Sequence, residues 1–73
     1  MRVDVVAELV ASVVRTVRAP GETVRAGDAL LLVESMKMEI PVQAPVDGQV
    51  AAVHVEAGDI VSEGDLLVEI DPA

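Results

Sequence analysis

Short apolar segments separated by turn residues run along the whole chain. The apolar segments are rich in Val, Leu and Ile, whose branched side chains pack well on a pleated sheet and, in Val and Ile, lose rotamer freedom in helices. In the second half we expect strands over residues 49–55, 60–61 and 66–70. Glycine, proline and aspartate predict the intervening turns, over residues 44–48, 56–59 and 62–65.

The sequence repeats itself with a constant offset of 37 residues. Matching pairs include Val5 and Val42, Ala7 and Ala44, Val13 and Val50, Gly21 and Gly58, Val24 and Val61, Gly27 and Gly64, and Leu30 and Leu67. The repeat predicts two half-repeats, about 3–34 and 40–71, within a single domain 1–73. Residues 3–17 are apolar enough for a helix, but they match a stretch that contains Pro45 and Asp47-Gly48. We therefore expect strands there as well.

Each half has one apolar sheet face, and two such faces can bury each other. The expected fold is all-β, a flattened β-barrel or sandwich with pseudo-two-fold symmetry. Glycines are expected to shape its structural turns: Gly21, Gly27, Gly58 and Gly64, which occur as matching pairs, and Gly48.

The joint between the halves lies within residues 35–39, where the chain must reverse. This segment contains no Gly, Pro, Asn or Asp, and propensity alone would predict one strand from Ala29 to Val42. A tight hairpin with a primed turn needs positive φ, which is costly for Met or Lys. A turn without turn residues indicates that its side chains are required for something other than folding.

Lys37 lies in this joint and is the only lysine among five cationic residues. The four arginines cannot act as amine nucleophiles, because guanidinium groups stay protonated. A single lysine could also arise by chance in a sequence that prefers arginine. Its place at the joint is what makes it a candidate functional residue.

Composition excludes several classes of function. The net charge is −8 and there are no aromatic residues, which argues against nucleic acid as a partner. The absence of cysteine excludes disulfides and thiolate metal sites. No membrane span or signal peptide is evident, so we expect no membrane association and a cytoplasmic location. His54, the only histidine, has no marked metal or catalytic partner and is expected at a solvated strand position.

The segment Glu34-Ser35-Met36-Lys37-Met38-Glu39 resembles the attachment motif E-[AS]-M-K-M of biotin carboxyl carrier domains, within the biotinyl/lipoyl attachment family. The similarity runs from about Val3 to Ile70 and includes Gly58-Asp59 and Gly64-Asp65. It implies a small, thumbless barrel-sandwich hybrid of two four-stranded antiparallel sheets. The lysine would lie at an exposed hairpin tip.

The resemblance also implies a function. A biotin protein ligase would attach biotin covalently to Lys37, and Glu34, Met36, Met38 and Glu39 would be recognised by that ligase. The carrier would then take a carboxyl group from a biotin carboxylase to a carboxyltransferase. We expect no catalytic residue and no metal site in the domain, because the cofactor carries the chemistry and the protein supplies placement. No base is evident beside the lysine, so its deprotonation is assigned to the ligase.

Three alternatives stay open. Lipoyl domains share the fold but typically carry D-K-A at the tip, so a lipoyl or dual biotin/lipoyl carrier is one alternative. A second alternative is a free-standing biotinylated binding protein without a carboxylase. If Met1 is the natural start, the chain is a free-standing carrier. Met36 and Met38 could also be ordinary gap-filling residues. One departure concerns Ala11, which stands where the family often has a turn glycine.

Overall fold

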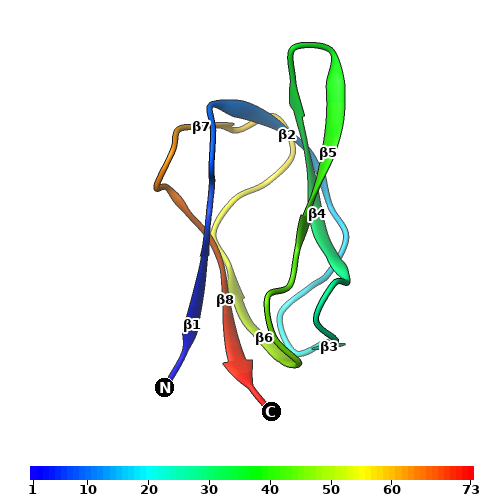
Figure 1. Ribbon diagram of the computed structural model, residues 1–73, viewed down its shortest axis with the longest axis vertical. Coiled ribbons are helices and arrows are strands. Elements are labelled where there is room, and N and C mark those ends of the chain that lie inside the picture. Colours follow the sequence, from blue (N-terminus) through cyan, green and yellow to red (C-terminus); the bar gives the residue numbers. More distant parts are fainter.

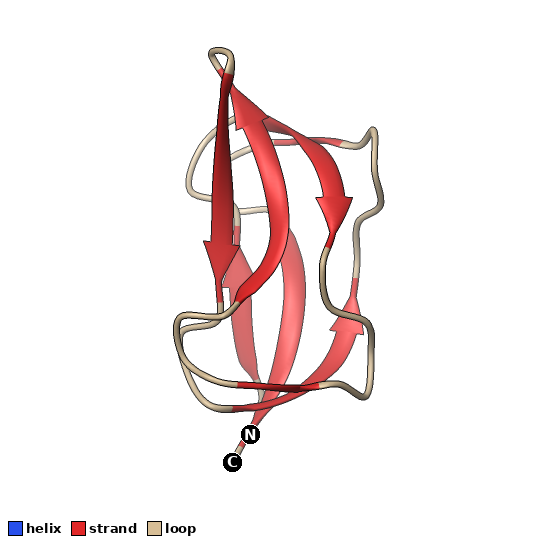
Figure 2. Ribbon diagram, turned by 90° about the vertical axis from the view of Figure 1, so that its right-hand side faces the viewer, coloured by secondary structure: helices blue, strands red, loops and turns tan.

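The computed structural model describes residues 1–73 and contains eight β-strands and no helix. In chain order the strands are β1 (Val3–Val6), β2 (Ala11–Thr16), β3 (Thr23–Val24), β4 (Ala29–Ser35), β5 (Met38–Gln43), β6 (Gly48–Val53), β7 (Ile60–Val61) and β8 (Leu66–Pro72). They form two four-stranded antiparallel sheets, packed face to face (Figures 1 and 2). This confirms the predicted fold class. The fold offers no helix that could cross a membrane.

The two sheets are copies of each other. The β8 sheet has the strand order β1-β8-β6-β3, and the β4 sheet has the order β5-β4-β2-β7. The offset of the repeat converts β1–β4 into β5–β8 and therefore one sheet into the other. Irregularities in the register follow the same rule, between Val13 and Arg15 in β2 and between Val50 and Ala52 in β6. Each sheet thus takes two strands from each half, so neither half has a complete sheet of its own.

The core lies between the two sheets and is made only of Val, Leu, Ile and Ala. Its 14 buried residues are Val5, Ala7, Ala11, Val13, Val24, Leu30, Leu31, Val33, Ala44, Val50, Val61, Leu67, Val68 and Ile70. Most occur as pairs at the repeat offset, so both halves contribute to one core. Inward residues alternate with outward residues at the start of β2 and of β6, as expected for strands that are covered on one face.

Four of the predicted turn glycines have φ between 90° and 96°, a region that side chains with a Cβ rarely adopt. Gly27 and Gly64 show their role most clearly. Their amides donate to the carbonyls of Ala44 and Ala7, each at 2.8 Å, and so tie each turn to the other half of the chain. In both turns the next residue is an aspartate whose carboxylate accepts a hydrogen bond from the amide three residues earlier.

Gly48 is a strand residue rather than the turn residue that the sequence predicts. It opens β6, is buried, and pairs with Pro72 of β8. A Cβ at this position would overlap the carbonyl oxygen of Asp71 and lie 2.9 Å from the Cα of Pro72. Its repeat counterpart Ala11 pairs with Val61 but with no residue of β4, and a methyl group fits there. The glycine therefore allows β6 and β8 to approach each other closely.

We expect Gly48→Ala to lower the free energy of unfolding by about 3 kcal/mol, because the new methyl group meets rigid backbone atoms. Gly64→Ala is the matched comparison. A Cβ there meets nothing within 4 Å, so only the positive φ is penalised, by about 1 kcal/mol. Urea unfolding of both variants measures the difference. Equal destabilisation by the two substitutions would contradict the close-approach explanation.

Candidate functional site

The joint between the halves is a two-residue hairpin turn between β4 and β5. Ser35 pairs with Met38, and the two residues between them have positive φ, 53° for Met36 and 65° for Lys37. This is the primed geometry that the chain reversal requires. The uninterrupted strand that propensity favours from Ala29 to Val42 is therefore broken at its centre. The sequence lacks the usual signal for such a turn, because neither Met36 nor Lys37 is Gly or Asn.

The hairpin tip lies at one end of a molecule with extents of 34 × 18 × 17 Å, and both termini lie at the other end (Figure 1). Met36 is 92% exposed and Met38 is 63% exposed, and Lys37 is exposed between them. Side chains this exposed fill no gap in the core, so the gap-filling interpretation of the methionines is wrong. Left-handed backbone at two residues with side chains costs about 1–2 kcal/mol for each residue. The turn is therefore both accessible and strained.

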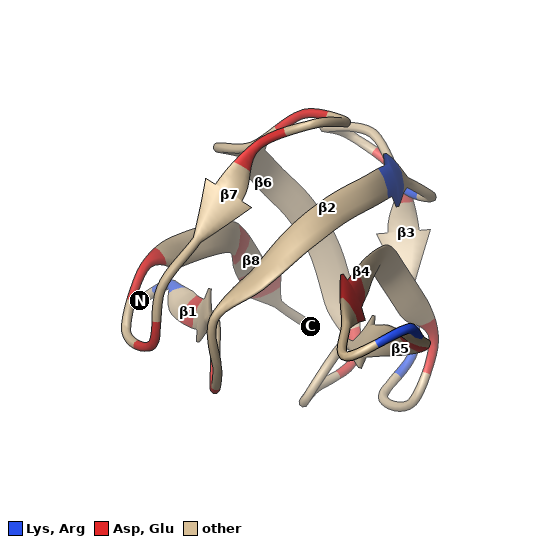
Figure 3. Ribbon diagram, turned by 90° about the horizontal axis from the view of Figure 1, so that it is seen from above, with Lys and Arg blue, Asp and Glu red and all other residues tan.

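Two carboxylates lie directly behind the tip. Glu34 of β4 and Glu39 of β5 are cross-strand partners, and both are exposed. Neither they nor Lys37 take part in any ion pair or side-chain hydrogen bond of the structure. Figure 3 looks onto this end of the molecule and shows the β4–β5 turn in blue with acidic positions beside it. The Lys37 amine thus has no hydrogen-bonded or ion-paired partner that could act as its base.

His54 lies in a different part of the molecule, just after β6. Its Nε2 is 2.7 Å from Oε1 of Glu69, and Arg2 is 3.6 Å from the same carboxylate and 3.0 Å from Asp71. The hydrogen bond and the negative charge of Asp71 raise the pKa of the Arg2 guanidinium above its ordinary value. The sequence predicts an exposed His54, and the structure shows that exposure together with a hydrogen bond to Glu69. The pairing was missed because these residues are distant in sequence and meet only through the β1-β8-β6 register.

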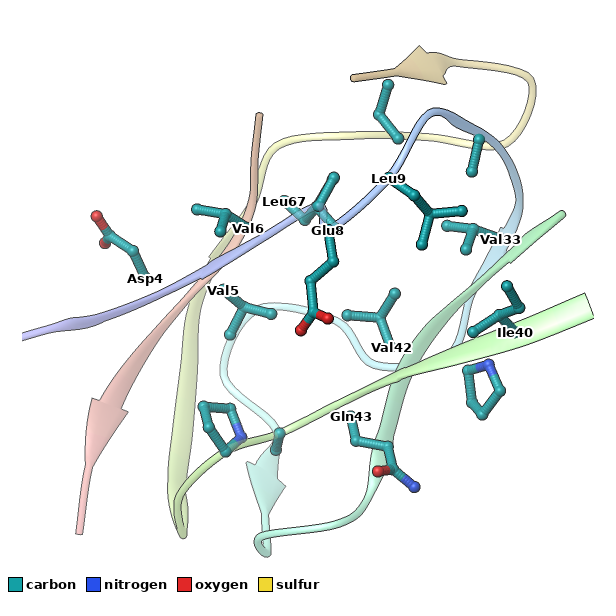
Figure 4. Close-up of a pocket in the computed structure, with 16 residues that line it drawn as sticks. Asp4, Val5, Val6, Glu8, Leu9, Val33, Ile40, Val42, Gln43 and Leu67 are labelled. Atoms are coloured by element: carbon teal, nitrogen blue, oxygen red, sulfur yellow. The ribbon is translucent and has the colours of Figure 1, made fainter. Parts of the chain in front are cut away.

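A groove of about 460 Å³ lies between the edge strands β1 and β5 (Figure 4). Core residues such as Val33 and Leu67 and the partly buried Val42 form part of its lining, and Glu8 and Gln43 supply polar groups. It follows the seam where the two sheets are not hydrogen-bonded to each other. The groove contains no lysine, histidine or cysteine, so it brings no nucleophile together with a base. No group of three or more potential metal-ligating side chains is present in the fold.

The sequence of almost the whole chain is similar to that of known proteins. A family model described as "Biotin-requiring enzyme" matches residues 1–70. The chain is 51% identical over 70 residues to the biotinylated protein TB7.3 homolog of Mycobacterium leprae, covering 96% of this chain and 99% of that protein. It is 46% identical over 67 residues to pyruvate carboxylase of Staphylococcus aureus, covering 92% of this chain but 6% of that enzyme.

Solved structures give the same result. Urea carboxylase of Kluyveromyces lactis superimposes with a TM-score of 0.93 at 32% identity, over 97% of this chain and 6% of the enzyme. The lipoyl domain of the 2-oxoglutarate dehydrogenase complex from Azotobacter vinelandii gives a TM-score of 0.74 at 28% identity, over 88% of this chain and 81% of that domain. The chain therefore belongs to the biotinyl/lipoyl attachment domain family, as a biotin-attachment domain like those of biotin-dependent carboxylases, and its cofactor is biotin.

Proposed function

We propose that Lys37 is the residue to which a biotin protein ligase attaches biotin, and that the domain carries a carboxyl group from a biotin carboxylase to a carboxyltransferase. The observation that carries this proposal is the position of Lys37. The only lysine of the chain lies at an exposed, strained two-residue turn, between two exposed methionines, at the end of the molecule farthest from both termini.

No other side chain of the sequence has a primary amine. Both ends of the chain lie at the opposite end of the molecule (Figure 1). The hairpin that carries Lys37 is held firmly, because β4 is a central strand that pairs with β5 on one side and with β2 on the other. The side chain therefore projects from a rigid base, which suits an amine that must enter the active sites of other proteins.

The residues of this chain contribute placement rather than proton transfer. The exposed tip leaves the amine open to an incoming acyl group, and no side chain is positioned to remove its proton. A biotin group bound there supplies a nitrogen that accepts and releases a carboxyl group. The tether raises the effective concentration of that group near two active sites. Activation and transfer belong to the partner enzymes.

Specific observations favour two other candidates. The similarity to a lipoyl domain supports a carrier that also accepts lipoate. The relative that matches this chain over almost its whole length is named only as a biotinylated protein, which supports a biotinylated binding protein with no carboxylase role. Intact-mass analysis of the native protein separates the two adducts. Reconstitution with purified carboxylase subunits separates a carrier from a binding protein.

We expect Lys37→Arg to abolish biotinylation when the chain is produced together with a biotin protein ligase. Arginine keeps the positive charge and the stem but has no amine that can be acylated. Streptavidin blotting and intact mass measure the modification. The thermal unfolding midpoint should stay within about 1 °C, because Lys37 makes no contact that the substitution removes. Biotin on the variant chain would refute the assignment.

Because the turn is strained, a substitution there is predicted to stabilise the protein and at the same time to slow biotinylation. We expect Met36→Asn to raise the free energy of unfolding by about 0.5–1 kcal/mol, because Asn accepts positive φ more readily than Met. The same change should slow biotinylation, since it removes an exposed side chain next to Lys37.

Met38→Asn is the control for this prediction. Met38 pairs with Ser35 within the hairpin ladder and has no positive φ, so Asn should not stabilise the protein there. Urea unfolding and the initial rate of biotin incorporation are measured for both variants. An unchanged or lower stability of Met36→Asn would show that the turn is not strained.

A further inference from the structure

The duplication provides an internal comparison between the outer faces of the two sheets. Paired strand positions related by the 37-residue offset occupy equivalent places in the two sheets, apart from local differences such as that between Ala11 and Gly48, so a systematic difference between their side chains does not come from the strand order. The outer face of the β8 sheet is polar and paired. The outer face of the β4 sheet, which leads to Lys37, has more apolar side chains and an acidic edge, with one exposed cation, Arg15, paired with Leu32.

One row of side chains crosses the β4 sheet near the hairpin. The registers place Glu39 beside Glu34, Glu34 beside Ser12, and Ser12 beside Ile60. Val13 and Val33 on either side point into the core, so this row faces outward. Ile60 is 70% exposed at the end of the row.

The equivalent row of the β8 sheet contains Arg2, Asp71, Gln49 and Thr23. Arg2 donates from Nε to Asp71 at 3.0 Å, and the Gln49 amide donates to a backbone carbonyl at 2.8 Å. Where the β8 sheet has the salt bridge between Arg2 and Asp71, the β4 sheet has two unpaired carboxylates, Glu39 and Glu34. Where the β8 sheet has Thr23, the β4 sheet has the exposed Ile60.

Neighbouring positions show the same difference. Leu32 and Pro41 are paired on the β4 sheet, where the β8 sheet has Glu69 and Asp4. Val10, just before β2, is 63% exposed. Its counterpart Asp47 instead accepts a hydrogen bond from the amide of Ala26 at 2.8 Å. We call the surface formed by Val10, Leu32, Pro41 and Ile60, with Glu34 and Glu39 at its edge, the β4 face.

We propose that the β4 face is the docking surface for the enzyme that attaches biotin to Lys37, and that this enzyme meets it with an apolar area bordered by basic side chains. The inference rests on the proposed function. An enzyme that receives the tip must cover the turn, and β4 and β5 lead from the turn directly onto this face. The β8 sheet instead ends at the termini, on the far side of the molecule (Figure 1).

Charge decides the kind of partner. Like charges directly opposite each other destabilise a strand pair, and Glu34 and Glu39 form no ion pair with a cation of their own chain. A basic surface relieves that repulsion, whereas a second copy of this chain brings a further net charge of −8 to the contact. Attachment of biotin is also an encounter between separate molecules, so it needs a recognition surface even where a carrier is covalently joined to its carboxylase.

The test replaces β4-face residues by their counterparts from the other sheet. The double variant Val10→Asp/Ile60→Thr changes two exposed side chains and keeps a β-branched residue in β7, so the fold should be preserved. We expect KM for biotinylation by a biotin protein ligase to rise about tenfold with kcat unchanged. Thr23→Ile, at the equivalent position of the β8 sheet, is the matched control and should leave both constants unchanged.

Two further measurements sharpen the outcome. KM of the wild-type protein should rise with ionic strength, and Glu39→Gln should weaken that dependence. Sedimentation should show a monomer, and a dimer dispersed by Ile60→Thr would assign the face to self-association and overturn the proposal. An unchanged KM of the double variant, with biotin still on Lys37 of the wild type, refutes the docking surface alone. Biotin retained by Lys37→Arg refutes the proposed function itself.

Discussion

Neither half of this chain can bury its apolar face alone, and the rest of the structure follows from that constraint. The core has no aromatic residue, so it must be closed by many small branched side chains that meet from both sheets. Interleaving is the solution. Each sheet takes two strands from each half, and turns such as those at Gly27 and Gly64 are hydrogen-bonded to the opposite half. A stable half-domain is therefore not expected.

The same interleaving determines where a functional group can be presented. With two equivalent halves, the chain has one connection between them at one end and its two termini at the other (Figure 2). Only at the end with the connection is a side chain held by hydrogen-bonded strands both before and after it in the chain. Lys37 lies in this connection, directly after β4, which is a central strand rather than an edge strand. The fold thus provides one rigid, protruding position, and the sequence places its only lysine at that position.

Much of the fold could be predicted, because the repeat shows weak strand and turn patterns twice, at positions 37 residues apart. The strand at 60–61 was predicted to the residue, and the strand at 66–70 extends in the structure to Pro72. Gly48 was misassigned, because a local reading sees the turn signal of Asp-Gly but not the backbone of β8 beside it. The hydrogen bond of His54 with Glu69 depends on the register between β6 and β8, which no local pattern specifies. Lys37 stands out as a candidate because its turn lacks the residues that such a geometry usually contains.

The two ends of the molecule also differ in stability for reasons that the backbone does not dictate. At the terminal end, Arg2 and Asp71 neutralise each other at 3.0 Å. At the hairpin end, the equivalent positions are Glu39 and Glu34, and the turn beyond them holds two side-chain-bearing residues at positive φ. Both departures weaken the same end, and both lie within a few residues of Lys37. The pair Arg2 and Asp71 shows that these two strand positions accommodate a salt bridge, so the repulsion between Glu34 and Glu39 comes from the sequence and not from the architecture. The turn has no counterpart in the other half: its positive φ follows from the chain reversal, and the choice of Met and Lys there comes from the sequence. A free energy penalty concentrated around the only lysine is most simply explained by recognition, since a binding partner can supply the opposite charge and cover the exposed methionines that the isolated domain leaves open to water.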